Sequence, residues 1–471
     1  MGRGEWSPGE DKTLAGAYMR FISAAKNTSS NGTRGIVAIP VKANWGPVGE
    51  LVEITSEDEL KNVYHTDFGG GFTAFKLISL MLLGNPNKVI GYRVADGSEA
   101  KASVKLQDGA AVDVLTLTTK HPTSLEFNVT IRDSLTEQGS QELILYEGTR
   151  KLFEVPFSDI DALVSAVNTS TRNEWLTATK DNDGTLASVT NEPLAGGNSG
   201  VASVTNEQYM DALTAFEAHR FDAFTLDGIV DADLRASVAE WTKRLRSQGK
   251  KITTFLGGSA TDDETPSTGF NRSRSLDYEG IVNIGVSGEY DGVWYSSAEV
   301  ASYFAGLVSG LPLRESVTFA VTPFTDVKPR LTYEQKKEAV TSGTIVMSYE
   351  NGKVRCERGV NTLNTLRENQ NDTWKKIKMV RVKDAIDMDT SSESIEKFIG
   401  KVPNNPDGQA YVLSALKNYF ETLSPTLIAP DFTVEMDQER MATAGKDQFF
   451  WEYRVADIDT MEEIYGTGYH Q

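Results

Sequence analysis

The residue types that most often carry chemistry are few in this sequence and lie far apart. The four histidines are His65, His121, His219 and His470, and none has the spacing of a metal-ligand motif such as HExxH. The GxGxxG and P-loop motifs that bind nucleotide phosphates are absent from the sequence. These residues predict no catalytic site, no cofactor site and no metal site.

Three short segments come close to a chemical motif. Gly285-Val286-Ser287-Gly288 resembles a nucleophile elbow but lacks the final glycine, so we interpret it as the end of a strand. Asp181-Asn182-Asp183-Gly184 begins like a calcium-binding loop but lacks the later oxygen ligands, so we expect a turn. Asp262-Asp263-Glu264 has the charge to hold a cation loosely, yet we expect a solvated acidic loop there.

A cluster of positive charge stands out in this acidic chain. Two interpretations of it remain open. The cluster is either the solvated edge of a strand or a docking patch for an acidic partner, since complementary charge sets the register and rate of association. Its members fall within nine residues with no carboxylate between them, and they are Lys375, Lys376, Lys378, Arg381 and Lys383.

The composition narrows the class of protein. At 471 residues the chain exceeds the usual size of one hydrophobic core, so we expect several domains. The net charge of -19 opposes binding to nucleic acids, which needs clustered Lys and Arg, and favours solubility. The longest apolar run, 77–83, is too short to cross a bilayer, and the polar residues 1–12 lack the pattern of an export signal. The single cysteine, Cys356, is expected to be a buried thiol in a reducing cytoplasm.

The apolar pattern predicts an arm followed by a discontinuous core. Residues 1–22 are expected to be an N-terminal arm. Residues 23–94 and 200–343 alternate strands with amphipathic helices, which predicts an α/β core with a parallel sheet. Two helices in the core are expected to begin with capping boxes, at Ser56-Glu57-Asp58-Glu59 and Thr205-Asn206-Glu207-Gln208.

The insertion and the C-terminal domain show other patterns. Residues 95–199 include the alternation of apolar and polar residues at 127–131, which predicts an inserted β-rich domain. Residues 344–464 contain the hairpin signal Asn351-Gly352, an amphipathic helix and a strand pair, which is typical of an α+β domain. Residues 465–471 are expected to be a short C-terminal arm.

Several segments carry a resemblance to a known family. They are Gly16-Ala17-Tyr18, 34–40, Trp45-Gly46-Pro47 and Ile54-Thr55-Ser56 near the start, 194–200 after the insertion, 206–255 and 303–321 in the core, and 359–363, 381–386 and 398–402 near the end. In order and spacing they resemble the contractile tail sheath family, which myophages, R-type bacteriocins and other contractile injection systems share. The resemblance covers nearly the whole chain.

The resemblance implies a structural protein and not an enzyme, built on a subtilisin-like α/β core without a catalytic triad. Its subunits would polymerise as stacked hexameric rings around a tail tube, and contraction would drive the tube through a cell envelope without a cofactor. The implied partners are further copies of the chain, the tail tube protein, the baseplate and the tail terminator, and not nucleic acid or membrane. The implied location is a virion tail or tail-like particle made in the cytoplasm of a host bacterium.

The resemblance also implies where the subunits meet. The terminal arms would add strands to neighbouring subunits, the C-terminal domain would lie nearest the tube, and the inserted domain would face outward. The implied inter-subunit strands contain Ala17, Tyr18, Met19, Arg20, Phe21 and Ile22 in one arm and Tyr465, Thr467 and Tyr469 in the other. The implied tube-facing basic patch consists of Lys375, Lys376, Lys378, Arg381 and Lys383.

Two other functions remain open. The first is another self-assembling tail or surface component, although tube proteins are normally smaller all-β chains and exported layer proteins need a signal. The second is a hydrolase on the α/β core, which would need a nucleophile beside a histidine, whereas His219 falls inside a predicted helix. A hydrolase would act as a monomer, while a sheath protein would only assemble.

Overall fold

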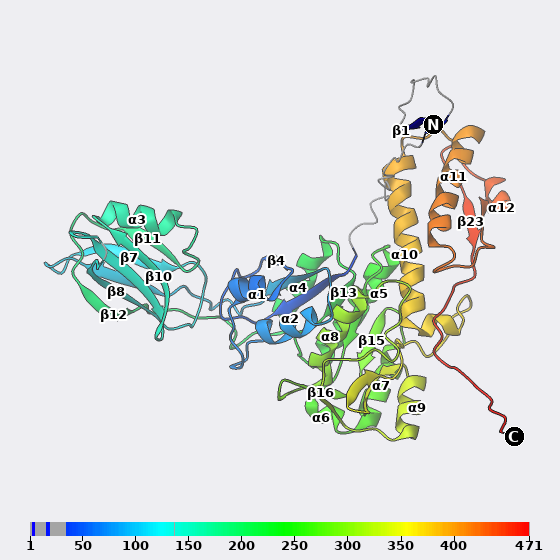
Figure 1. Ribbon diagram of the computed structural model, residues 1–471, viewed down its shortest axis with the longest axis horizontal. Helices are drawn as coiled ribbons and strands as arrows, with labels where there is room; N and C mark the ends of the chain where they lie inside the picture. The colour runs from blue at the N-terminus through cyan, green and yellow to red at the C-terminus, as the bar shows by residue number, and fades with distance from the viewer. Residues whose placement is uncertain (1, 5–15, 19–33, 136, 471) are drawn as a thin grey trace. The chain divides into compact units, whose positions relative to one another are not determined.

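A computed structural model of the chain describes residues 2–4, 16–18, 34–135 and 137–470. The chain divides into two units, Met1–Arg34 and Gly35–Gln471. In the first unit, strands β1 (Gly2–Gly4) and β2 (Gly16–Tyr18) pair in parallel. The second unit holds a mixed α/β core, a β-rich insertion that contains one helix, and a C-terminal α+β part (Figure 1).

The core is built on a seven-stranded sheet to which both flanks of the insertion contribute. Val37 on one flank lies opposite Ala223 on the other in a parallel pair. Only β4 runs antiparallel, at one edge. In sheet order, the strands are β19 (Thr344–Ile345), β15 (Ile281–Ile284), β14 (Thr253–Leu256), β13 (Ala223–Thr225), β3 (Ile36–Val41), β5 (Lys88–Arg93) and β4 (Leu51–Ile54).

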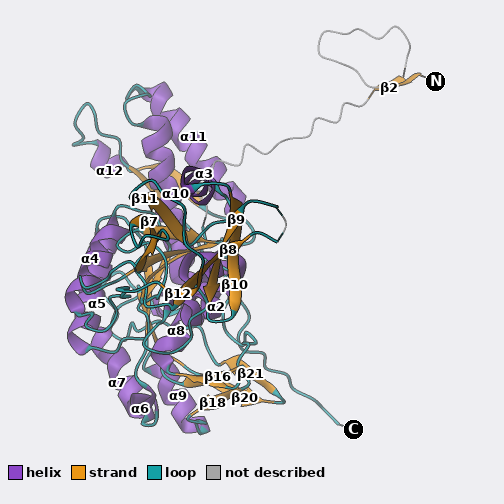
Figure 2. Ribbon diagram, turned by 90° about the vertical axis from the view of Figure 1, so that its left-hand side faces the viewer, coloured by secondary structure: helices purple, strands orange, loops and turns teal. Residues whose placement is uncertain are grey.

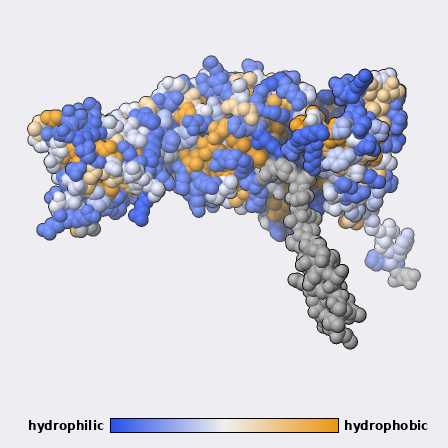
Figure 3. Space-filling view, turned by 90° about the horizontal axis from the view of Figure 1, so that it is seen from above, coloured by the Kyte–Doolittle hydropathy of each residue, from blue (hydrophilic) through white to orange (hydrophobic). Residues whose placement is uncertain are grey.

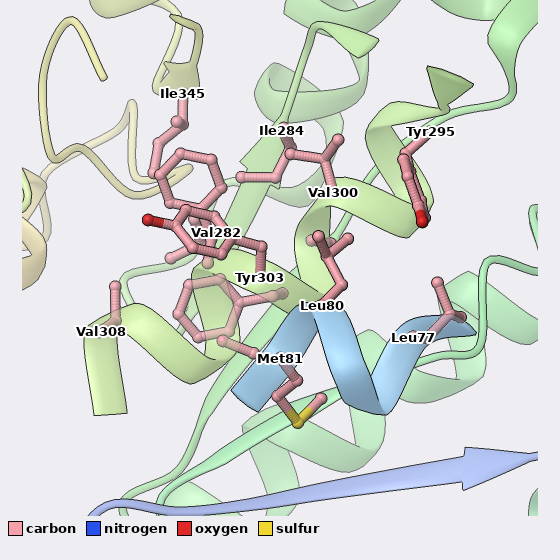
Figure 4. Close-up of a cluster of buried hydrophobic side chains, with 14 of the residues drawn as sticks. Leu77, Leu80, Met81, Val282, Ile284, Tyr295, Val300, Tyr303, Val308 and Ile345 are labelled. Carbon is pink, nitrogen blue, oxygen red and sulfur yellow. The ribbon is translucent and has the colours of Figure 1, made fainter. Parts of the chain in front are cut away.

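Helices cover both faces of this sheet, which is why its central strands are apolar on both sides. Along β3, Val37 and Ile39 belong to the hydrophobic cluster of α2 (Ala74–Leu82) and α8 (Ser297–Gly310). Ile36 and Ala38 belong to the cluster of α4 (Asn206–Glu217) and α5 (Ala232–Ser247) on the other face. Figure 4 shows the first cluster, in which labelled side chains of α2 and α8 meet. The remaining core helices are α1 (Glu57–Tyr64), α6 (Ala260–Asp263), α7 (Pro266–Leu276) and α9 (Tyr333–Thr341).

Helix α2 approaches α8 closely because glycine stands at the contact. A Cβ added to Gly306 would lie 2.1 Å from the backbone oxygen of Met81, and one added to Gly84 would lie 2.2 Å from the backbone nitrogen of Leu307. Neither position leaves room for a side chain. The two glycines therefore allow the close approach of two helices that both contribute to the core cluster.

Both predicted helix starts are confirmed, one with a different partner. The side-chain oxygen of Gln208 accepts from the backbone N–H of Thr205 at 2.8 Å, as a capping box requires. At α1, Ser56 Oγ accepts from the backbone N–H of Glu59 at 3.2 Å, but the Glu59 carboxylate accepts from the N–H of Thr55 at 2.7 Å. At α1, the hydrogen bond from the Glu59 carboxylate therefore goes to Thr55, one residue before the N-cap Ser56.

The inserted domain is a β-sandwich with one helix. The predicted alternation is confirmed, because Phe127, Val129 and Ile131 are all fully buried. One sheet has the order β10-β9-β8-β12 and the other the order β11-β7-β6 (Figures 1 and 2). The elements are β6 (Ser103–Gln107), β7 (Asp113–Thr119), β8 (Phe127–Asp133), β9 (Gln141–Glu147), β10 (Arg150–Phe157), α3 (Ile160–Thr169), β11 (Leu176–Lys180) and β12 (Val189–Pro193).

A small three-stranded sheet and a hairpin pack against the core. The predicted hairpin is confirmed: Asn351 and Gly352 both have positive φ, at 50° and 77°, between β20 (Met347–Glu350) and β21 (Lys353–Cys356). The hairpin and β19 belong to the core cluster, although the sequence pattern assigned residues after 343 to the C-terminal domain. Cys356 is fully buried there, as predicted. The three-stranded sheet contains β16 (Ser287–Tyr290), β17 (Val293–Tyr295) and β18 (Asp326–Lys328).

The C-terminal part contains two long helices and a two-stranded sheet. Its own hydrophobic cluster includes Val382 and Ile386 from α10 and Phe420 from α11. The elements are the short helical turn η1 (Asp372–Lys375), α10 (Ile377–Glu393), η2 (Ser394–Phe398), α11 (Pro406–Leu423), β22 (Thr433–Met436), α12 (Gln438–Met441) and β23 (Trp451–Arg454).

Helix α10 shows that the strand-edge interpretation of the basic cluster is wrong. Charged and apolar residues are interspersed at 375–383, and some stretches alternate as in a strand. The helix instead places Ile377 in the core cluster and Val382 in the C-terminal cluster. Burial of apolar side chains in two separate clusters outweighs the local alternation.

The surface is polar over most of the face shown in Figure 3, with hydrophobic residues gathered in patches. None of the helices in the described ranges is both long and apolar enough to span a bilayer.

Candidate assembly interface

The β22–β23 pair is a sheet with two open edges. Its register runs from Thr433 opposite Arg454 to Met436 opposite Trp451. Throughout the described residues, each of these strands pairs only with the other. A two-stranded sheet of four-residue strands is marginal alone in water, and its outer edges carry backbone N–H and C=O groups that can accept further strands.

Helix α11 supports one face of this sheet. The ring of Phe420, which is fully buried, lies 4.9 Å from the ring of Tyr453 and 5.9 Å from that of Phe432. Trp451 packs against the same cluster. The sheet is therefore held by aromatic contacts on a face, and its edges remain open.

The residues predicted to form the N-terminal strand are only partly described by the structure. Ala17 and Tyr18 lie in β2, which pairs with β1 of the same chain. Met19, Arg20, Phe21 and Ile22 lie outside the described residues. The pairing of the predicted segment with a neighbouring subunit stays a prediction.

The predicted C-terminal arm is exposed. Tyr465 and Tyr469 are 88% and 91% exposed, and Thr467 is exposed as well. Up to residue 470, the described part of this arm has no strand. Its aromatic side chains make few contacts, among which the Tyr465 hydroxyl donates to Glu463 at 2.7 Å.

The basic cluster lies against an acidic segment of its own chain, residues 457–463, which we call the strap. Lys376 Nζ lies 2.5 Å from Asp459 Oδ2 and 2.9 Å from Glu462 Oε2. Lys383 Nζ lies 2.7 Å from Asp457 Oδ2. Lys378 Nζ lies 3.9 Å from Asp459 Oδ1. The strap thus already provides an acidic partner for three of the five cations.

Lys378 and the other two members of the cluster differ in their surroundings. Lys378 is buried and donates to the backbone oxygen of Ile458 in the strap at 2.8 Å. Arg381 donates to the backbone oxygen of Leu311 at 2.7 Å. Lys375 pairs with Asp372 at 2.9 Å, and its side chain is 38% exposed. Lys375 is therefore more exposed than the three lysines that hold the strap.

The strap also reaches the core. Arg358 Nη2 lies 3.1 Å from Glu462 Oε2, and Thr318 Oγ1 donates to Glu462 Oε1 at 2.8 Å. Burial alone would lower the pKa of Lys376, but the carboxylates of Asp459 and Glu462 outweigh it and raise that pKa. The strap is held by a charge network that joins the core and the C-terminal part.

The sequence contains a signal for this contact, although local patterns do not reveal the pairing. Four carboxylates fall within seven residues, at Asp457, Asp459, Glu462 and Glu463. Their charge is opposite to that of the basic cluster. The two segments are separated by about eighty residues in the sequence, and the tertiary structure brings them into contact.

We expect reversal of two strap-binding charges to release the strap. In a Lys376→Glu/Lys383→Glu variant, like charges replace ion pairs, so the local opening free energy of residues 457–463 should fall by about 1–2 kcal/mol. Hydrogen exchange of the strap amides, measured by mass spectrometry, reports this loss. Lys375→Glu is the matched control, since Lys375 pairs outside the strap. Equal protection in the double variant and the control would refute the strap contact.

The motif-like segments do not assemble a reactive centre. Ser287 Oγ donates to Asp263 at 2.6 Å, and Ser297 Oγ donates to the other oxygen of that carboxylate at 2.5 Å. The expectation of a solvated loop at Asp263 is wrong, because its side chain is buried among these hydroxyls, and burial raises its pKa. Within the described residues, no hydrogen bond joins Ser287 to a histidine, and no group of three or more ligand residues forms a metal site.

Four models of tail sheath domains match consecutive parts of this chain. The Tail sheath protein Gp18 domain III N-terminal region matches residues 34–66, and the phage tail sheath protein beta-sandwich domain matches 95–199. The phage tail sheath protein central domain matches 202–362, and the phage tail sheath C-terminal domain matches 369–471.

Individual relatives agree with these matches. The phage-like element PBSX protein XkdK of Bacillus subtilis is 26% identical over 490 residues, which cover 99% of each chain. The sheath tail protein of Desulfitobacterium hafniense has a similar fold, with a TM-score of 0.71 at 23% identity over 94% of this chain and 100% of that one. The contracted helical sheath of the anti-feeding prophage gives 0.54 at 12% identity, over 98% and 100%. With four domain models matched in order along its length, the chain belongs to the phage tail sheath protein family.

Proposed function

We propose that this protein is the polymerising subunit of a contractile sheath, which stacks as hexameric rings around a tail tube and shortens to drive the tube through a cell envelope. The observation that carries the proposal is the β22–β23 sheet with both edges open. The strand-forming N-terminal residues at β2 support it.

Strand addition gives a physical route to the polymer. An arm that pairs with an open edge of β22 or β23 satisfies the backbone groups of both partners. The main-chain hydrogen bonds then join subunits through extended segments, so each globular body stays free to rotate and shift. The exposed tyrosines at 465 and 469 belong to a second segment suited to this role.

Contraction needs no chemical energy source in this proposal. The extended lattice is metastable, and the subunits gain mutual contact when they tilt and move outward. The α/β core acts as a rigid, subtilisin-like scaffold without a catalytic role. The C-terminal part lies nearest the tube, the inserted sandwich faces outward, and the sheath ends at the baseplate and the tail terminator of a virion tail or tail-like particle.

We assign the tube contact to the basic patch, and within it chiefly to Lys375. The strap neutralises Lys376 and Lys383, and Lys378 is buried. The exposed Lys375 is the lysine best suited to meet an acidic tube. Lys375→Glu should then weaken assembly on tubes without changing the strap.

Negative-stain electron microscopy of the purified chain tests the function. We expect concentrated protein to form hollow, regularly striated polymers, and monomers to show no hydrolytic activity on ester or peptide substrates. A chain that stays monomeric in every condition and hydrolyses such substrates would favour the hydrolase alternative. Flat sheets in place of hollow polymers would favour a surface component.

A further inference from the structure

The inserted sandwich and the core share a buried joint. Arg93, fully buried at the end of β5, donates from Nη1 to the backbone oxygen of Gly46 at 2.7 Å and from Nη2 to that of Ser199 at 2.9 Å. Trp45 follows the core strand β3 but packs in the hydrophobic cluster of the sandwich, with its ring 4.9 Å from that of Trp175. These contacts fasten the two domains where the chain passes between them.

His65 bridges the two domains at this joint. It follows directly after α1 of the core, and its side chain is 8% exposed. Its Nε2 lies 2.9 Å from Oε1 of Glu147 at the end of β9 in the sandwich, and its Nδ1 lies 3.3 Å from Oδ1 of Asp67. Its ring meets that of Trp175 edge to face at 6.1 Å. A single imidazole thus lies between two carboxylates, one from each domain.

The backbone of His65 is in a conformation that histidine normally avoids. Its φ of 61° and ψ of 176° fall in a region that is essentially restricted to glycine. Such a conformation persists only where the surrounding contacts hold it. At His65 those contacts are the backbone N–H bond to the Lys61 oxygen at 3.1 Å, the two ion pairs and the ring packing, so the two carboxylates are part of what holds this conformation.

The charges that face this site make the imidazole a cation. Burial alone would lower the pKa of His65, but Asp67 and Glu147 outweigh it and raise the pKa to about 9. His65 in turn lowers the pKa of Glu147 to about 2, with help from Arg150 on β10, whose Nη2 lies 2.5 Å from Glu147 Oε2.

The remaining charged and titratable groups around the joint do not replace this cation. Tyr64 and Arg93 lie on the core side, and burial lowers the pKa of Arg93 to about 10, so its guanidinium stays charged at neutral pH. His121 packs against Trp45, and burial, with Arg93 nearby, lowers its pKa to about 4, so it is neutral. Of these four groups in the described part of the joint, His65 is the one whose pKa of about 9 lies in the mildly alkaline range.

We propose that His65, held between Asp67 and Glu147, is a protonation-dependent latch that locks the inserted β-sandwich to the core. With the imidazole charged, it screens the two carboxylates from one another and holds both. When the proton leaves, the neutral ring keeps one N–H and can donate to only one of the two carboxylates, so one ion pair between the domains and their shared cation are lost. The sandwich then moves more freely relative to the core.

The direction of the pH dependence follows from the two pKa shifts. Because the folded pKa of His65 is raised, its contribution is fully present below its ordinary pKa of about 6.5 and is lost as pH rises through about 9. Because the pKa of Glu147 is lowered, its contribution is present above about 4.5 and is lost as pH falls through about 2. The latch is therefore closed at neutral pH and opens on the alkaline side.

The test uses unassembled full-length chain and does not depend on sheath formation. Spin labels at Ser188→Cys in the sandwich and Ala236→Cys on α5 report the distance between the domains, and the buried Cys356 stays unlabelled. Histidine labelled with carbon-13 gives four ring signals, because the chain has four histidines. Two variants remove the latch: Glu147→Gln removes its carboxylate, and His65→Gly removes the imidazole while relieving the backbone strain. Glu154→Gln on β10 is the control, since that carboxylate pairs with Lys151.

We expect a narrow distance distribution for the wild type and the control at about pH 7, and a broader one for the wild type at about pH 9.5, where most of His65 has lost its proton and most of Arg93 keeps its charge. Both latch variants should be broad at either pH, and Glu147→Gln should lower the pKa of His65 by at least about one unit. Distributions in the latch variants as narrow as the wild type, or a wild-type distribution that stays narrow after His65 has lost its proton, would overturn the latch. Circular dichroism at each pH establishes that the domains stay folded.

Discussion

Removal of residues 1–22 should yield a folded, soluble monomer that forms no long sheaths. The globular unit Gly35–Gln471 does not include these residues, so its cores and thermal unfolding should be unchanged. In the proposed function, the arm supplies the strand that pairs with an open β22–β23 edge of another copy, so its removal should end the linkage between subunits. Polymer length in electron micrographs measures the loss of sheath formation, and the thermal unfolding midpoint of the monomer measures whether the fold is kept.

Two single substitutions in β2 test whether backbone pairing of the strand, and not only the presence of the arm, is needed for assembly. Tyr18→Pro removes a backbone N–H and should block addition of the strand, whereas Tyr18→Thr keeps strand propensity and should still assemble. If the truncated chain, or the proline variant, polymerises to full length, linkage through the N-terminal arm is wrong for this protein.

Arg246→Met should strongly destabilise the joint between the core and the C-terminal part. Arg246, on α5, is 4% exposed and forms two hydrogen bonds of 2.8 Å with the carboxylate of Asp384 on α10. Burial already raises the pKa of Asp384, so removal of its cation leaves a buried carboxylate without a partner. The cost is about 3–5 kcal/mol, which corresponds to a fall of roughly 10 °C in the first thermal transition.

Two further variants make this measurement decisive. Arg246→Met/Asp384→Leu removes both charges and should recover most of the lost stability, because an apolar pair of similar volume is often neutral. Arg244→Met, also on α5, breaks an exposed pair with Glu217 of α4 and should leave the first transition close to that of the wild type. A first transition in Arg246→Met that matches that of Arg244→Met would show that the buried pair contributes little.

Short-range patterns predicted short-range structure well. The hairpin at Asn351-Gly352 and the cap of α4 depend on residues within a few positions of one another, and both are confirmed. The alternation at 127–131 identified a strand with one buried face. In each case the local backbone preference and burial in the tertiary structure favour the same conformation, so the sequence alone is enough to predict it.

Other features depend on contacts between distant residues, and there the local pattern was insufficient or misleading. One interpretation of the basic cluster is the solvated edge of a strand, but two hydrophobic clusters make residues 377–393 a helix. The acidic residue Asp263 looked solvated, yet two serines from other elements bury it. The sequence shows the five basic residues, but local patterns do not reveal the strap that holds three of them, Lys376, Lys378 and Lys383.

His65 shows the physical reason for this division most directly. In the sequence it is one of four scattered histidines with no motif around it. Its charge, its strain and its role at the joint come from Glu147, eighty-two positions away, and from a backbone conformation that no propensity favours. The period of apolar residues and the short turn motifs involve residues close together in the sequence. They are therefore enough to predict most helices, strands and turns, and the order of such segments carries the family resemblance. The electrostatic environment of a buried group depends on which elements the fold brings together, and for this protein only the three-dimensional arrangement supplies it.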